Sequence, residues 1–196
     1  MENLTPLCRL AYEYGTDKCP QMGHTYTPYY YQLFKDRRQT VRKVLEVGIG
    51  SPSTMKHVKG YKIGASLFMW REFFPKAQIY GVDILQETIF EADRIKTFLL
   101  NERDKPGLRR LVKEIGADID LFIDDGLHVL SDQVRTCRTV MPYLSKDTTY
   151  MIEDVRRPAS MMEKMADYDI SMINLAHLYG RAKLGNYLAM VKHKHE

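Results

Sequence analysis

The sequence lacks long apolar runs, low-complexity segments and internal repeats. None of its apolar stretches approaches the roughly 18–20 residues that a membrane-spanning helix needs, so we expect no membrane association. The start, Met1-Glu2-Asn3, has neither the basic nor the apolar region of a signal peptide. We therefore expect one domain over residues 1–196, with a helical segment at 1–40 near the active site, in the cytoplasm.

Cysteine is scarce, and its pattern is uninformative about metals. Cys8, Cys19 and Cys137 are the three cysteines, and no two have the spacing of a zinc-binding pair. An odd, small number fits reduced thiols rather than a disulfide framework.

The excess of positive charge is also small, since 29 Lys and Arg against 25 Asp and Glu give a net charge of +4. Such a balance does not by itself indicate nucleic-acid binding.

Apolar runs alternate with amphipathic segments along most of the chain, which is typical of βαβ units. We expect strands at 43–47, 78–83, 95–99, 119–123 and 148–152, with an antiparallel edge pair at 171–175 and 187–191. We expect helices at 4–14, 26–34, 64–74, 106–115 and 131–143. Ser66 is expected to cap the third of them, and Pro106 suits the first turn of the fourth. The sequence thus predicts an α/β fold with a mostly parallel sheet and an antiparallel pair of strands at one edge.

Two acidic pairs follow two of these strands. Asp124-Asp125-Gly126-Leu127-His128 follows the fourth strand, and Glu153-Asp154 follows the fifth. Parallel strands end at one edge of the sheet, where open α/β folds bind ligands. Carboxylates gathered there repel one another unless a cation or protons neutralise them, and hard oxygen ligands suit Mg²⁺ or Ca²⁺. The alternative is that these are solvated turn and helix-capping residues.

A second pattern indicates an adenosine-type cofactor. The first strand runs into Glu46-Val47-Gly48-Ile49-Gly50, where glycines let the backbone approach a ligand, and Asp83 ends the second strand, where a carboxylate reaches a ribose. A dinucleotide fingerprint fits less well, because Ser53 stands where a third glycine is needed and Asp83 comes too late. A pair of turn glycines with a surface aspartate is the alternative.

Several segments, in order, resemble one known family. They are Gly15-Thr16-Asp17-Lys18, His24-Thr25-Tyr26-Thr27-Pro28, Leu45–Gly50, Gly64–Leu67, Met69–Pro75, Ile79–Asp83, Ile123–His128 and Ile152–Asp154. Over residues 15 to about 155 the chain resembles the class I S-adenosylmethionine (SAM) dependent methyltransferases. More narrowly, it resembles the metal-dependent sugar O-methyltransferases of macrolide biosynthesis, the macrocin and mycinamicin type.

The resemblance implies a Rossmann-like, doubly wound α/β fold, with helices on both faces of a mostly parallel, seven-stranded sheet whose final strand is antiparallel. It implies Mg²⁺, or another divalent cation, bound by Asp125, Glu153 and Asp154, with His128 as the general base. It further implies a set of residues that bind SAM, with Asp124 in a supporting role: Thr16, Tyr26, Glu46, Gly48, Gly50, Ser66, Asp83, Asn101 and Asp124. Leu127 departs from the family, which has serine before the histidine, and Leu100–Asp104 replaces the usual segment near the adenine.

The resemblance predicts an O-methyltransferase that acts on a hydroxyl of a sugar or other polyol. Basic residues such as Arg156-Arg157 are either solvated charges or a sign of an anionic small-molecule acceptor. A methyltransferase for RNA ends or nucleotides is the alternative, and an inert SAM-binding module is a third hypothesis. Association into a homo-oligomer is compatible with this sequence.

Overall fold

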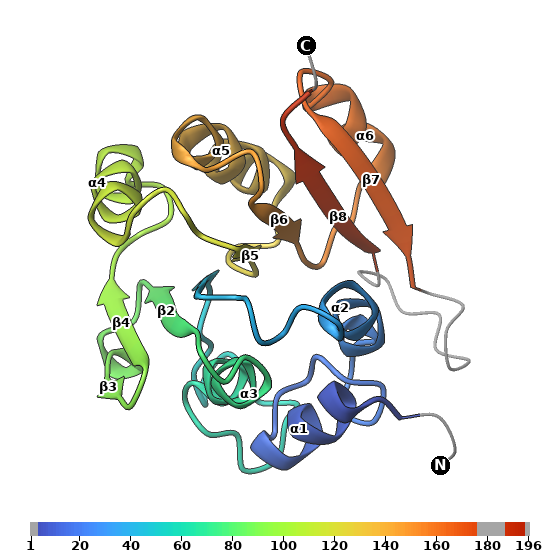
Figure 1. Cartoon of the computed structure of the whole chain (residues 1–196), viewed down its shortest axis with the longest axis vertical. Helices are drawn as coiled ribbons and strands as arrows, with labels where there is room; N and C mark the ends of the chain where they lie inside the picture. The colour runs from blue at the N-terminus through green and yellow to red at the C-terminus, as the bar shows by residue number, and fades with distance from the viewer. Residues whose placement is uncertain (1–3, 176–186, 195–196) are drawn as a thin grey trace.

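The structure of the chain is a computed structural model that describes residues 4–175 and 187–194 (Figure 1). Its centre is one eight-stranded sheet with the order β3-β4-β2-β1-β5-β6-β8-β7. The strands are β1 (Lys43–Val47), β2 (Gln78–Asp83), β3 (Glu91–Ala92), β4 (Ile95–Leu99), β5 (Leu121–Asp124), β6 (Thr149–Ile152), β7 (Asp169–Asn174) and β8 (Tyr187–Lys192).

Most neighbouring strands are parallel. The pairs β4–β2, β2–β1, β1–β5 and β5–β6 are parallel, whereas β8 lies antiparallel between β6 and β7. The expected α/β class and the reversed final strand are therefore confirmed. The antiparallel edge pair is confirmed as well, with bounds that differ by one or two residues from those expected.

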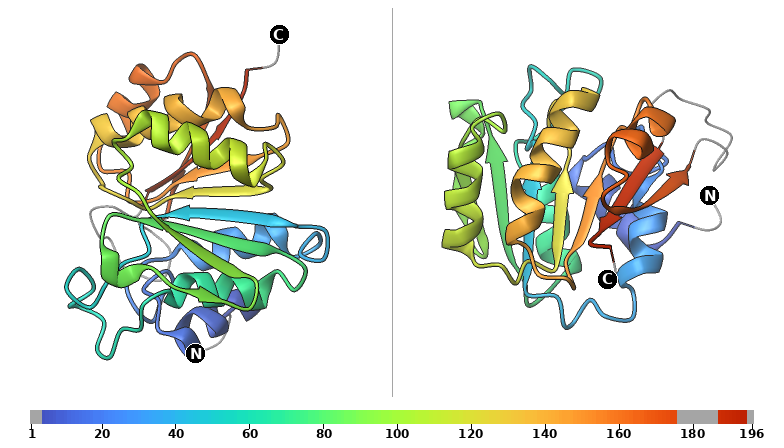
Figure 2. Two further views of the ribbon diagram at one scale, coloured as in Figure 1. Left: turned by 90° about the vertical axis from the view of Figure 1, so that its left-hand side faces the viewer. Right: turned by 90° about the horizontal axis from the view of Figure 1, so that it is seen from above.

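Helices cover both faces of the sheet. Figures 1 and 2 show α1 (Pro6–Tyr14), α2 (Tyr26–Phe34) and α3 (Ala65–Phe73) on one face, and α4 (Lys105–Ile115), α5 (Leu130–Val140) and α6 (Pro158–Lys164) on the other. Each layer closes over its own apolar core. Trp70 and Phe73 belong to the first core, while Phe122 and Tyr150 stack in the second with ring centroids 4.6 Å apart. Among the described residues, no helix is long and apolar enough to cross a membrane.

The sheet has eight strands rather than seven, because the two-residue strand β3 pairs antiparallel with β4. Arg94, with φ of 55°, makes the tight turn between them. So short a strand shows no alternation of apolar residues, which is why the sequence did not indicate it. Helix α6 was also not expected; Pro158 occupies its first turn, a position that suits proline.

Helix α3 begins differently from the prediction. Ser66 was expected to cap it, but Gly64 is the N-cap, in the left-handed region with φ of 77°, and no side chain caps the helix. A Cβ atom at Gly64 would overlap the ring of Phe90. The glycine therefore allows both the turn and the close packing of the helix start on Phe90, and it leaves Ser66 within the first turn.

The carboxyl ends of β1, β5 and β6 meet at the point where the chain changes faces. From β1 it continues to α3 on one face, and from β5 to α5 on the other. A crevice opens at such a switch point in doubly wound sheets. The loop between α1 and α2 also ends near these strands, because Tyr26 and Thr25 contact residues 154 and 175.

Candidate active site

A cavity of about 600 Å³ lies at the carboxyl edge of the sheet. A volume of this size suits a small-molecule ligand or cofactor. Of the residues that the sequence indicated, eleven line it: Thr16, Tyr26, Gly48, Gly50, Ser66, Asp83, Asn101, Asp125, His128, Glu153 and Asp154. Glu46 and Asp124 lie behind its wall, each at most 1% exposed.

The glycine turn after β1 forms the floor of this cavity. Gly48 has φ of 93°, and a Cβ atom there would overlap the backbone carbonyl of Asp125. The loops after β1 and β5 thus pass each other at a distance that a side chain at residue 48 would prevent. This close approach brings the glycine turn and the acidic loop to one site.

Asp83 is held rigidly beside that turn. Its Oδ2 accepts hydrogen bonds from the backbone N–H groups of Ile49 and Gly50, at 2.9 and 3.2 Å, and its Oδ1 accepts one from Leu85 at 3.0 Å. A carboxylate has about four acceptor sites, so it retains capacity for ligand hydroxyl groups. Asp83 lines the cavity at the carboxyl end of β2, and its predicted role in cofactor binding stays a prediction.

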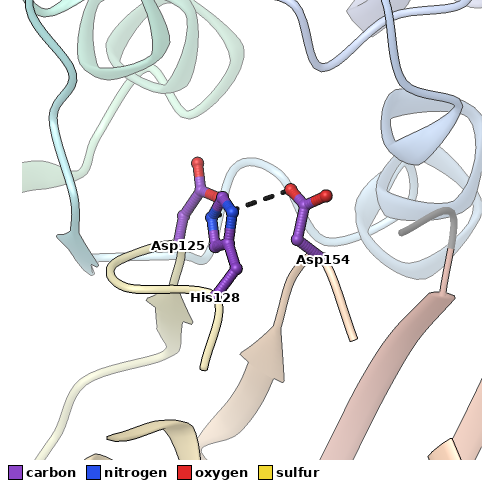
Figure 3. A group of neighbouring side chains, drawn as sticks. All are labelled: Asp125, His128 and Asp154. Atoms are coloured by element: carbon purple, nitrogen blue, oxygen red, sulfur yellow. Dashed lines mark hydrogen bonds and ion pairs between the residues drawn. The ribbon is translucent and has the colours of Figure 1, made fainter. Parts of the chain in front are cut away.

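Asp125, His128 and Asp154 converge on one point of the cavity (Figure 3). His128 Nε2 lies 3.1 Å from Asp125 Oδ1 and 3.7 Å from Asp154 Oδ2. One ligand atom from each of the three residues lies within 4.8 Å of the others, an arrangement that could hold a metal ion. Two of the three predicted acidic ligands therefore come together with the predicted base.

Asp154 adopts a backbone conformation that is uncommon for a residue other than glycine. Its φ is 52°, in the left-handed region that few residues other than glycine adopt, although aspartate and asparagine occur there more often than most. Its N–H donates a hydrogen bond of 3.2 Å to the hydroxyl of Tyr26, and this contact helps to hold the turn. Strained residues of this kind cluster at functional sites, because the surrounding structure enforces the geometry that the site needs.

The carboxylates dominate the electrostatics of this group. Burial lowers the pKa of His128, but the hydrogen bond to Asp125 and the charges of Asp125, Asp154 and Glu153 outweigh that effect and raise it to about 9. Burial raises the pKa of Asp125, but the charge of Lys18 and the contact with His128 bring it well below its usual value. At neutral pH the group thus contains an ionised Asp125 beside a protonated His128.

Lys18 lies at the centre of the acidic residues, and the sequence analysis assigned it no role. Its Nζ lies 2.5 Å from Glu153 Oε2, 2.6 Å from Asp125 Oδ2 and 3.2 Å from Glu46 Oε1, and its side chain is 2% exposed. Burial lowers the pKa of Lys18, but the charges of these carboxylates raise it well above its usual value. The signal available in the sequence was the excess of predicted carboxylates at one edge, since buried carboxylates need a cation.

Glu153 lines the same cavity but is not one of the three residues of the group that could hold a metal ion. Its Oε2 contacts Lys18, and its Oε1 accepts a hydrogen bond of 2.8 Å from the hydroxyl of Tyr30. The backbone carbonyl of Glu153 accepts another from Gln133 Nε2, at 2.8 Å. Glu153 is therefore not a member of the group that converges with Asp125, and its role as a metal ligand stays a prediction.

Glu46 and Asp124 support the site from behind. Glu46 Oε2 accepts a hydrogen bond of 3.0 Å from Trp70 Nε1, and Asp124 Oδ2 accepts one of 3.3 Å from the hydroxyl of Tyr150. Burial raises the pKa of both carboxyl groups. Their positions favour an indirect contribution to cofactor binding, and the predicted role of each in that binding stays a prediction.

Glu102 also lines the cavity, although the sequence did not indicate a role for it. It directly follows Asn101, which was predicted to bind the cofactor. Its carboxylate accepts hydrogen bonds from the backbone N–H of Leu127 at 3.2 Å, and a Cβ atom at Gly126 would overlap it. Leu127 itself is 46% exposed and lies at the cavity wall. The loop that precedes His128 is thus fixed by Glu102 and presents an apolar side chain to the cavity.

Segment 51–63, which follows the glycine turn, forms another part of the wall. The hydroxyl of Tyr61 donates a hydrogen bond of 2.7 Å to the carbonyl of Ile49, and His57 Nε2 lies 3.0 Å from Asp17 Oδ2. His24 stacks on Tyr26 with ring centroids 4.8 Å apart. These contacts bring the segment that precedes β1 in the sequence and the segment that follows it together at the cavity.

No protein-family profile matches the chain. Among curated proteins, it is 37% identical over 153 residues to the 8-demethyl-8-(2-methoxy-alpha-L-rhamnosyl)-tetracenomycin-C 3'-O-methyltransferase of Streptomyces olivaceus. It is 34% identical over 155 residues to the mycinamicin VI 2''-O-methyltransferase of Micromonospora griseorubida. Each match covers 76% of this chain but 36% of the relative, so the matched region is about a third of those proteins.

Solved structures show the same relationship. The mycinamicin biosynthetic methyltransferase MycE, in complex with Mg and S-adenosylhomocysteine (SAH), matches with a TM-score of 0.67 and 32% identity over 78% of this chain and 37% of that one. A second crystal form matches with a TM-score of 0.73 and 26% identity over 97% of this chain and 55% of the other. The chain therefore has the Rossmann-like methyltransferase fold and is a homologue of the sugar O-methyltransferases of the mycinamicin, tetracenomycin and macrocin type.

Proposed function

We propose that the chain transfers a methyl group from SAM to a hydroxyl of a sugar or similar polyol, with the help of a divalent cation. The observation that supports this most directly is the shared cavity. A glycine turn with a fixed acidic partner at residue 83 lines one part of it, and the group Asp125, His128 and Asp154 lines another. Donor and acceptor sites must adjoin in this way for an in-line transfer.

The part of the cavity near β1 and β2 suits the donor. Asp83 presents acceptor oxygens to ribose hydroxyls, and Gly48 keeps the floor free of a side chain. Ser66, Asn101 and the segment with Thr16 and Tyr26 complete the proposed donor site. The MycE structures, in which SAH is bound, support this assignment by homology.

The group in Figure 3 suits a divalent cation by the chemistry of its donors. Asp125 and Asp154 offer carboxylate oxygens, the ligands that Mg²⁺ prefers, within 4.8 Å of each other and of a ring nitrogen of His128. When bound, such a cation would polarise the acceptor hydroxyl, lower its pKa and offset the charge of the carboxylates. The MycE complexes contain Mg, which supports the proposal.

In the proposed reaction His128 accepts the proton of the acceptor hydroxyl. Its ring lies in the cavity wall, and Asp125 orients it through the 3.1 Å contact with Nε2. General base catalysis of this kind contributes about 10²–10⁴-fold in rate. His128 must lose its own proton first, because the nearby carboxylates raise its pKa to about 9.

The acceptor is proposed to be a small molecule with adjacent hydroxyl groups, since the curated homologues are named for sugar substrates. Arg156 lies at the cavity and would suit an acceptor that carries a negative charge. The 196-residue chain should be assayed with labelled SAM on a panel of glycosides and nucleotide sugars, with Mg²⁺ and with EDTA. We expect methylation that EDTA abolishes. Metal-independent turnover, or methylation of oligonucleotides alone, would contradict the proposal.

A further inference from the structure

Lys18 links the ends of three adjacent strands. Its ammonium group has three N–H donors, and it contacts one carboxylate at each strand end: Glu46 of β1, Asp125 after β5 and Glu153 after β6. A buried lysine is costly unless it is paired, and here all its partners are acidic. The residues that contact it are 28, 107 and 135 positions away, and the two most distant contacts are the shortest.

Two of these carboxylates also belong to the predicted cation site. The two carboxylate oxygens of Asp125 have different partners. Oδ2 contacts the ammonium group of Lys18, whereas Oδ1 faces the ring of His128 in the predicted cation site. Glu153, predicted to be a metal ligand, is held by Lys18 through Oε2 and by Tyr30 through Oε1. A divalent cation that uses Asp125 therefore lies close to a second positive charge, and one that also recruits Glu153 must replace a contact of 2.5 Å.

We propose that Lys18 is the resident counter-cation of this acidic cluster and competes with the divalent cation for Asp125 and Glu153. This inference rests on the proposed function. Glu46, Asp125, Glu153 and Asp154 bring four formal negative charges, of which the ammonium group of Lys18 offsets one and a protonated His128 a second. Lys18 thus holds the cluster together without metal, and its charge weakens the binding of a divalent cation by repulsion.

The test compares Lys18→Met with the wild-type chain. Methionine has a similar length and no charge, so it removes the competitor while it fills most of the space. We expect the affinity for Mn²⁺, measured by calorimetry or by the EPR signal of free Mn²⁺ in the presence of SAH, to increase by about tenfold or more. Lys76→Met is the matched control, because Lys76 is exposed after α3, and it should leave the Mn²⁺ affinity unchanged.

Lys18→Met removes the partner of three carboxylates and could prevent folding. Lys18→Gln is the second variant, since its amide retains two N–H donors without the charge. Thermal unfolding with increasing Mn²⁺ should then show a larger stabilisation of Lys18→Gln than of wild type. Folded variants that bind Mn²⁺ no more tightly than wild type would overturn the inference.

The outcomes separate this inference from the proposed function. If wild type binds Mn²⁺ and the variants bind it no more tightly, the inference about Lys18 fails alone. If the variants bind Mn²⁺ and wild type does not, the competition is supported. If neither binds Mn²⁺ at any concentration that spares the fold, both the inference and the cation-dependent mechanism are wrong.

Discussion

Asp154 provides the sharpest test of the cation site at the level of single residues. Asp154→Asn removes a charge but suits the left-handed backbone at this position, because asparagine tolerates positive φ. We expect the kcat/KM for methyl transfer to fall by at least about 100-fold, since a bound metal contributes several kcal/mol to transition-state stabilisation. The thermal unfolding temperature should stay within about 2 °C of wild type, which corresponds to less than about 1 kcal/mol.

Asp93→Asn is the control for this variant, because Asp93 is 82% exposed and lies in the turn between β3 and β4. It should leave methyl transfer unchanged. An Asp154→Asn chain that is folded and keeps full activity would exclude Asp154 from the cation site.

The protonation of His128 should make the binding of a divalent cation depend on pH. Its pKa is raised to about 9 in the cation-free chain, so it is protonated at pH 7 and repels a cation near Asp125. As pH rises toward 9 the proton is lost, and the affinity for Mg²⁺ should increase, by up to about tenfold per pH unit. The affinity increases with pH, and does not decrease, because a proton on His128 and a bound Mg²⁺ compete for the same negatively charged site.

Calorimetric titration with Mg²⁺ at pH 7 and pH 9, in buffers of different ionisation enthalpy, measures both the affinity and the protons released. At pH 7 we expect release of up to one proton per cation. His128→Gln should lose most of the pH dependence in this range. An affinity that is the same at both pH values in wild type would show that His128 and the cation are not coupled.

At the level of elements, Gly64 controls how helix α3 begins. Gly64→Ala places a side chain at φ of 77° and against the ring of Phe90. The left-handed conformation alone costs about 1–2 kcal/mol for a residue with a Cβ atom, and displacement of Phe90 adds to this. We expect the free energy of unfolding in urea to fall by more than that amount.

Gly60 offers a matched comparison. It has φ of 71°, and nothing lies within 4 Å of a Cβ atom placed there. Gly60→Ala should therefore show the cost of the backbone conformation without the overlap. Equal losses in the two variants would mean that Phe90 moves aside freely and that the packing of α3 does not depend on the glycine.

For the molecule as a whole, the donor site predicts stabilisation by SAH. A ligand that binds only the folded chain, at 100 times its dissociation constant, stabilises it by about 2.7 kcal/mol. For a chain of this size we expect the thermal unfolding temperature to rise by about 5–10 °C. NAD serves as the control, because the sequence lacks the dinucleotide fingerprint; an equal shift with NAD would contradict the assignment of the cavity to SAM.

Much of the molecule was predictable from local sequence. The alternation of apolar and amphipathic segments indicated the α/β class, and helix α4 was placed to within a residue of its observed bounds. The elements that were missed, β3 and α6, are short or lie where no periodic pattern could develop. Short segments have too few residues to show a period, and their formation depends on the surface that they pack against.

The sequence by itself determined that two acidic loops and a glycine turn lie at one edge of a parallel sheet, because strands alternating with helices form βαβ units and parallel strands all end at the same edge. Only the tertiary structure decided which way each carboxylate faces. Glu153 turns to Lys18 and Tyr30, whereas Asp154 meets Asp125 and His128. The reason is physical: the contacts that Glu153 makes with Lys18 and Tyr30 join residues more than 100 positions apart, and no local pattern records them.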